Sequence, residues 1–205
     1  MRVADRFNPY HLLQNLAPVF LQVVFSDSTL WPSDYHSTSV SLAHILASNR
    51  YELHCFVLLD MLCSMLYGLP QLIEYDTSVP AFSTNKPSFH VFPAELQIIL
   101  VRINARCFQE PVADGRNDIE QSLLRWQPPL PTTAGEDSWK RIVELAVHES
   151  WRQTLLIYFY MVSALFFLKQ STRGRDECLT SLCRQSVASA LATLEYNHLY
   201  YRCFR

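Results

Sequence analysis

A single long helical pattern over residues 136–168 constrains this chain more than any other feature. Its first half spaces six apolar residues three and four positions apart, with charged residues between them: Trp139, Ile142, Val143, Ala146, Val147 and Trp151. This spacing predicts an amphipathic helix. From residue 155 to 168 the polar face is lost, and a helix that is apolar on every side lies inside protein or lipid. We therefore expect residues 155–168 to be buried.

The length of this apolar run favours protein over lipid as its surroundings. Spanning a bilayer takes about 20 mostly apolar residues, and this run is shorter, lying between Arg152 and Lys169. A buried core helix is the main prediction. The alternative is a membrane-associated helical protein in which residues 155–168 and 12–25 enter lipid, because flanking Arg and Lys side chains can reach the interface.

The composition agrees with a helical protein. Of the 205 residues, 49% are hydrophobic, 18% are charged and only four are glycine. Long apolar stretches with little glycine predict an all-α fold, an irregular helical bundle or solenoid-like array of about six to eight helices in one domain, residues 1–205. The net charge of −2 gives no general attraction to nucleic acid or to an anionic membrane.

The rest of the chain reads as helices separated by loops. Residues 10–25 are apolar, and Pro18 within them predicts a kink or two short helices. Gly68 and Pro70 end a second pattern, since glycine adopts the left-handed conformation and proline forbids continuation. The remaining predictions are helices at 40–67, with a break near 48–49, at 94–108, at 117–126 and at 176–197, and loops at 74–93 and 127–137. The loop at 74–93 is the best candidate for a lid.

Asp60 stands alone as a charge within an apolar helical pattern. It is the only charged residue between Glu52 and Glu74. A buried carboxylate costs several kcal/mol unless it is paired. We therefore expect a structural Asp60, hydrogen-bonded to a hydroxyl group or to an arginine of another helix.

The sequence contains none of the motifs that carry common enzyme chemistry. At His148, the sequence HESWR lacks the second histidine of a zinc protease motif, so a surface position near Glu144 is the simpler interpretation. The six cysteines form no Cys-x-x-Cys pair, which predicts free thiols, buried at Cys55 and Cys63, and no zinc site. We expect no enzymatic activity and no cofactor. The first residues lack a signal-peptide pattern, so we expect an intracellular protein.

Four strings, in this order, resemble one known family. They are RYELHCFVLLDMLCSMLYGLPQLIEYDTS (50–78), FPAELQIILVRINARC (92–107), IEQSLLRWQP (119–128) and ELAVHESWRQTLLIYFYM (144–161). Together, over residues 48–164, the chain is similar to the fungal-specific transcription factor domain. This domain is the helical regulatory region that follows the zinc binuclear cluster of fungal transcription factors.

The resemblance implies a fold, a function and a set of scaffold residues. It implies an all-α, non-enzymatic regulatory domain in the nucleus that acts through protein partners or a homodimer and senses a small apolar ligand. Carried over residue by residue, its scaffold positions are Asp60, Gly68, Pro70, Trp151, Arg152 and Tyr158. We expect Arg152 to pair with Asp60.

The chain departs from the family in one respect that bears on function. The zinc cluster requires closely spaced cysteine pairs and a basic loop, and this sequence has neither. We therefore do not expect this chain to bind DNA directly, and zinc would belong to a cluster outside it. An inactive, truncated fragment is a further alternative, suggested by the missing cluster and by the loss of the family pattern after residue 168.

Overall fold

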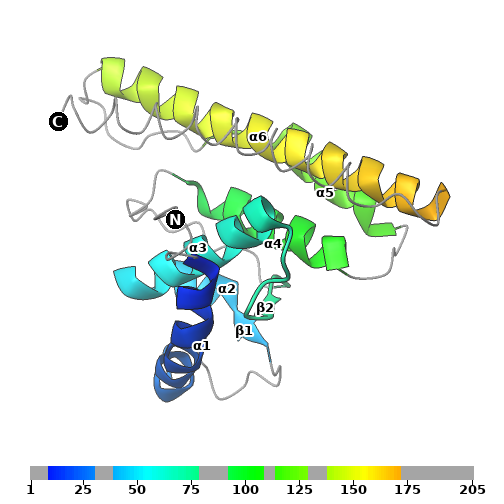
Figure 1. Cartoon of the computed structure of the whole chain (residues 1–205). Helices are drawn as coiled ribbons and strands as arrows, with labels where there is room; N and C mark the ends of the chain where they lie inside the picture. Colours follow the sequence, from blue (N-terminus) through cyan, green and yellow to red (C-terminus); the bar gives the residue numbers. More distant parts are fainter. Residues whose placement is uncertain (1–8, 31–38, 79–91, 109–113, 129–137, 172–205) are drawn as a thin grey trace, which may run out of the picture. The chain divides into compact units, whose positions relative to one another are not determined.

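The computed structural model describes residues 9–30, 39–78, 92–108, 114–128 and 138–171, and Figure 1 labels their helices and strands. The elements follow the order α1 (Pro9–Ser26), β1 (Val40–Ser41), α2 (Leu42–Ala47), α3 (Tyr51–Tyr67), β2 (Tyr75–Asp76), α4 (Ala94–Phe108), α5 (Asp114–Arg125) and α6 (Ser138–Ser171). The described part is all-α, as the sequence predicted. The predicted helix at 176–197 lies outside the described residues, as do positions 79–91 and 129–137 of the two predicted loops.

The chain divides into two compact units, Met1–Pro87 and Ser88–Arg205. We call them unit 1 and unit 2 and describe each by itself. Unit 1 contains α1 to β2, and unit 2 contains α4 to α6. The prediction of one domain over residues 1–205 stays a prediction.

In unit 1, α1 is one helix of 18 residues with Pro18 inside it. The sequence predicted a kink or two short helices there, and the alternative of two separate helices is wrong. The helix continues because its inner side is held on both sides of the proline: Leu13 and Phe20 are buried, and the Phe20 ring stacks on Phe56 of α3 at 4.2 Å. Burial of these side chains outweighs the one backbone hydrogen bond that proline removes.

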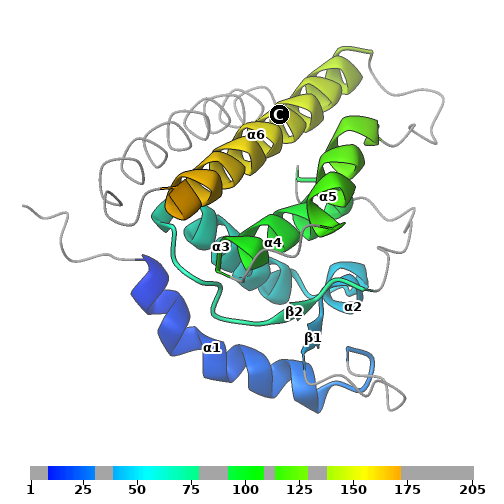
Figure 2. The same cartoon turned by 90° about the vertical axis from the view of Figure 1, so that its right-hand side faces the viewer.

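The middle of unit 1 contains a feature that the sequence did not predict. β1 and β2 form a parallel pair in which Val40 lies opposite Tyr75 and Ser41 opposite Asp76, and Figure 2 shows the two strands side by side. The Val40 N–H donates to the Glu74 carbonyl over 3.1 Å. The predicted loop at 74–93 therefore contains a strand near its start, and the predicted helix at 40–67 begins only at Leu42. The predicted break near residues 48–49 is confirmed, since α2 ends at Ala47 and α3 begins at Tyr51.

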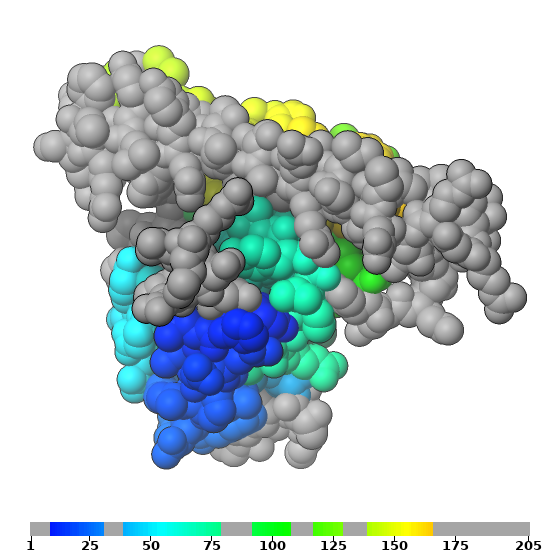
Figure 3. Space-filling view, viewed as in Figure 1, coloured from blue at the N-terminus to red at the C-terminus, as the bar shows by residue number. Residues whose placement is uncertain are grey.

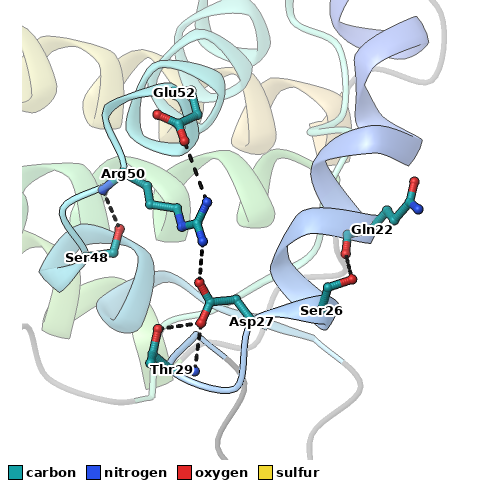
Figure 4. A network of polar contacts seen from close by, with 7 residues as sticks. All are labelled: Gln22, Ser26, Asp27, Thr29, Ser48, Arg50 and Glu52. Atoms are coloured by element: carbon teal, nitrogen blue, oxygen red, sulfur yellow. Dashed lines mark hydrogen bonds and ion pairs between the residues drawn. The ribbon is translucent and has the colours of Figure 1, made fainter.

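A surface network joins the end of α1 to the start of α3 (Figure 4). The Asp27 carboxylate accepts hydrogen bonds from the backbone N–H and the hydroxyl of Thr29. It also forms an ion pair with Arg50, whose Nη2 lies 2.8 Å from the carboxylate oxygen. The Thr29 hydroxyl is the main cause of a lowered pKa at Asp27. Arg50 also approaches Glu52 at 3.9 Å. Because Arg50 and Glu52 are exposed to solvent, the network orients the chain more than it stabilises it.

Unit 2 is formed by α4, α5 and α6, which contact one another. α6 runs without interruption, as Figure 1 shows. The predicted apolar face of α4 is confirmed, since Leu96, Leu100 and Ile103 are buried. Two of these, Leu96 and Leu100, are fully closed to solvent.

The surroundings of α6 differ from the prediction. Leu155, Tyr158 and Phe159 are buried, but Ile157 and Tyr160 are 47% and 44% exposed. The prediction that residues 155–168 are buried on every side is therefore wrong for the described side chains. The reason is packing: α4 and α5 cover only part of the circumference of α6. Ile157 remains open, and Tyr160 stays partly exposed although its hydroxyl donates to Glu120 of α5 over 2.7 Å.

Candidate functional site

Three of the family-like positions lie in unit 1: Asp60 in the middle of α3, and Gly68 and Pro70 directly after its end. Gly68 has φ 61° and ψ 36°, the left-handed conformation that glycine adopts without steric cost. Its N–H donates to the Ser64 carbonyl over 2.9 Å, and the Ser64 hydroxyl donates to the Leu69 carbonyl over 2.7 Å. These bonds close the last turn of α3 and reverse the chain.

The chain after the turn is tied back to α1. The Pro70 carbonyl accepts a hydrogen bond of 3.1 Å from the Tyr10 hydroxyl. Burial raises the pKa of Tyr10, and the negative charge of Asp60 adds to this effect. Tyr10 therefore remains a protonated donor at neutral pH.

Asp60 is fully buried and hydrogen-bonded, as the sequence predicted. Its carboxylate accepts from the Leu72 N–H at 2.9 Å, the Ile73 N–H at 3.4 Å and the Tyr75 hydroxyl at 3.1 Å. Burial raises the pKa of Asp60, and these hydrogen bonds oppose the rise. The three donors satisfy the carboxylate inside unit 1, so its burial needs no pairing with Arg152.

The other three family-like positions lie in unit 2 on α6, and each contacts a different segment. The Trp151 ring stacks on Phe92 with centroids 4.1 Å apart. The buried Tyr158 hydroxyl donates to the Asn104 side-chain oxygen on α4 over 2.9 Å. The Cys107 sulfur lies 3.5 Å from the same hydroxyl. Burial raises the pKa of Tyr158 well above its ordinary value.

Arg152 is the polar link between α6 and the end of α5. Its Nε and Nη2 donate to the two carboxylate oxygens of Glu149 at 2.8 and 2.6 Å. Its Nη1 donates to the Leu123 carbonyl at 3.5 Å. The hydrogen bond from Arg152 lowers the pKa of Glu149, so the pair is ionised at neutral pH.

His148 differs from its prediction as a surface residue. It is only 8% exposed, and its Nδ1 has no hydrogen-bond partner among the described residues. The Trp126 ring lies edge-on at 6.2 Å. Burial lowers the pKa of His148, while the charges of Glu144 and Glu95 oppose the change. The sequence signal was its spacing from the inward-facing positions Trp151 and Leu155, three and seven residues later.

The described residues contain no group of three or more His, Cys, Asp or Glu side chains placed to hold a metal ion. No helix in the described ranges is both long and apolar enough to cross a bilayer. Cys55, Cys63 and Cys107 are thiols rather than disulfides. Cys63 is buried as predicted, whereas Cys55 is half-buried.

Comparison of the chain with known protein families, with curated proteins and with solved structures finds no match in any of the three. The likeness to the fungal transcription factor domain therefore rests on the four sequence strings alone. It stays a prediction.

Proposed function

We propose that this chain is a non-enzymatic, helical regulatory domain of the transcription-factor type that acts in the nucleus through protein partners. The observation that supports it best is an all-α fold in which Asp60, Arg152 and Tyr158 form hydrogen bonds to neighbouring segments while large apolar side chains remain exposed. The likeness of the four sequence strings supports the same function. A small apolar ligand is the effector that this likeness implies.

The polar groups of the family-like positions support a structural role within such a domain. Asp60 accepts from three donors, and Tyr158 donates to Asn104. A catalytic acid or base must be within reach of a substrate. Asp60 and Tyr158 are instead buried and hydrogen-bonded to neighbouring segments.

The exposed apolar side chains support protein binding. On α1, Leu12, Leu16 and Val19 are 51%, 44% and 56% exposed and follow one another at helical spacing, on one side of the helix. α1 contains no Asp, Glu, Lys or Arg at all, and Figure 3 shows its surface open to the viewer. Exposed apolar faces of this kind are typical of surfaces that bind another protein.

Three described arginines support a function without direct DNA contact. Arg50 pairs with Asp27, Arg102 with Asp118, and Arg152 with Glu149. A surface that binds the phosphate backbone needs lysines and arginines gathered on one face. These three arginines come from different elements, and each one's charge is offset by a carboxylate.

A tethered reporter assay tests the proposal. The full chain is fused to an unrelated DNA-binding domain whose site lies upstream of a reporter gene in fungal cells. A regulatory domain changes reporter output several-fold relative to the DNA-binding domain alone. Leu155→Asp, which places a charge at a fully buried position, is the control and should lose the effect. Output equal to the DNA-binding domain alone, from a fusion that accumulates in the nucleus, would contradict the proposal.

A further inference from the structure

One side of α6 is exposed along most of the helix. Eight residues form this side, and all of them are exposed: Trp139, Ile142, Ala146, Glu149, Gln153, Ile157, Tyr160 and Ala164. Each is three or four positions from the next, so they form one row parallel to the helix axis. We call this row the outer stripe. The most exposed of its large apolar members is Ile142, at 64%.

The order of residues in the outer stripe is nearly symmetrical about its middle. Residues at equal distances from the two ends of the stripe can be paired with each other. In each outer pair a large apolar residue corresponds to a small or apolar one, and the central pair is polar. The pairs are Trp139 with Ala164, Ile142 with Tyr160, Ala146 with Ile157, and Glu149 with Gln153. A surface with this property is complementary to itself under a two-fold rotation.

We propose that two copies of this chain associate through their outer stripes, with the two α6 helices antiparallel. In this arrangement, the Trp139 ring of each copy covers Ala164 of the other, and Ile157 covers Ala146. Packing of large against small side chains lets two helices approach to the usual 8–10 Å or so between axes. The partner is thus a second copy of the same chain.

The charges of the outer stripe favour the antiparallel direction. Glu149 accepts hydrogen bonds from Arg152 and from the Gln153 amide at 2.7 Å within its own copy. In the antiparallel pair, Glu149 of one copy lies opposite Gln153 of the other, which can donate to it. In a parallel pair, Glu149 would face Glu149 and Trp139 would face Trp139, which adds repulsion and a clash of large side chains.

The size of the outer stripe sets the expected strength of the dimer. Stable interfaces use roughly 20–30 residues on each side, and the stripe offers eight. We therefore expect a weak, reversible dimer with a dissociation constant in the micromolar range. This inference goes beyond the proposed function, because it concerns the purified chain and is independent of the reporter assay.

Analytical ultracentrifugation of the full chain tests the dimer. Across concentrations of about 1 to 300 µM, which bracket a micromolar dissociation constant, the mass should rise from monomer to dimer. Ile142→Glu should raise the dissociation constant at least about tenfold, because the interface contains the substitution twice. Leu59→Glu, at an exposed position of α3, is the matched control and should leave it unchanged. A monomer at all concentrations, or a dimer that responds to Leu59→Glu and not to Ile142→Glu, would overturn the proposal.

A charge exchange tests the direction of the two helices. Ala146→Lys and Ile157→Glu should each weaken the dimer. Combined in one chain, they should restore it, because antiparallel helices place the new lysine of one copy opposite the new glutamate of the other. Parallel helices would place like charges together, so a double variant as weak as the single ones would overturn the antiparallel geometry. Circular dichroism verifies that each variant keeps its helices.

Discussion

The Tyr75 hydroxyl donates to the Asp60 carboxylate over 3.1 Å, and both side chains are buried. This bond joins the middle of α3 to the strand that follows it, β2. The two residues are fifteen positions apart in the sequence, with the Gly68 turn between them. The same carboxylate also accepts hydrogen bonds from two backbone N–H groups, so one side chain binds the returning segment at three points.

The first prediction concerns this carboxylate. Asp60→Ala should lower the free energy of unfolding by about 3 kcal/mol or more, because it leaves buried donors without an acceptor. Tyr75→Phe removes one donor and leaves the carboxylate with its two N–H groups, so it should cost only about 1–2 kcal/mol. Urea denaturation followed by circular dichroism measures both. Equal losses for the two variants would show that the carboxylate is not the centre of this network.

Gly68 gives a second prediction, with a matched control in the other unit. Gly68→Ala should destabilise the chain by about 1–2 kcal/mol, because Gly68 has a positive φ that is costly for residues with a Cβ. Gly115 lies in the first turn of α5, so the same substitution there should stabilise, by less than the roughly 0.5–1 kcal/mol expected in the middle of a helix. Thermal melts of the two variants should therefore move in opposite directions. A gain in stability from Gly68→Ala would contradict the left-handed end of α3.

Two tryptophans on α6 provide a third prediction. Trp151 stacks on Phe92, so Trp151→Ala should cost about 2–4 kcal/mol through lost packing and ring contact. Trp139 is 48% exposed, and Trp139→Ala should change the stability by no more than about 0.5 kcal/mol. Denaturation at low protein concentration keeps self-association out of the comparison. Equal effects of the two substitutions would show that α6 is not packed as described.

The fourth prediction is a pH dependence that arises from His148. Burial lowers the pKa of the folded-state His148 below the 6.5 of an exposed histidine. The unfolded chain therefore binds this proton more readily, and the stability that His148 contributes above pH 6.5 is lost as the pH falls through the folded-state pKa.

Urea denaturation at several pH values below 6.5 measures this effect. The wild-type chain should lose stability as the pH falls, and His148→Gln should lose less, since glutamine does not titrate. His11 is an exposed histidine, so His11→Gln is the matched control and should follow the wild type. An unchanged slope in His148→Gln would assign the pH dependence to other groups.

The sequence predicted the elements whose cause is local. α6 followed from the regular spacing of its apolar residues, and the end of α3 followed from Gly68 and Pro70, since each depends on neighbours within one or two turns. The buried Asp60 was also predictable, because an isolated carboxylate in an apolar helix needs donors. Its actual donors were not, since they come from a segment beyond the turn.

Features that depend on distant neighbours were missed. β1 and β2 have two residues each, too few for a strand pattern, and form only because the chain returns to pair them. An apolar run indicates that a helix can be buried, but it does not indicate how many sides of the helix other elements cover. The exposure of Ile157 was therefore not predicted. His148 was placed on the surface because its residue type outweighed its position on the helix.

The parallel pairing of Val40 with Tyr75 also bears on the order of events in time. α2 and α3 lie between the two strands and can form from local contacts, whereas the strands meet only after both ends of this segment come together. The pairing and the Tyr75–Asp60 bond should therefore form late in folding. Stopped-flow kinetics of Tyr75→Phe should show faster unfolding with a nearly unchanged folding rate. The contacts of the returning segment after α3 would then determine the unfolding rate of unit 1, and so how long it stays folded.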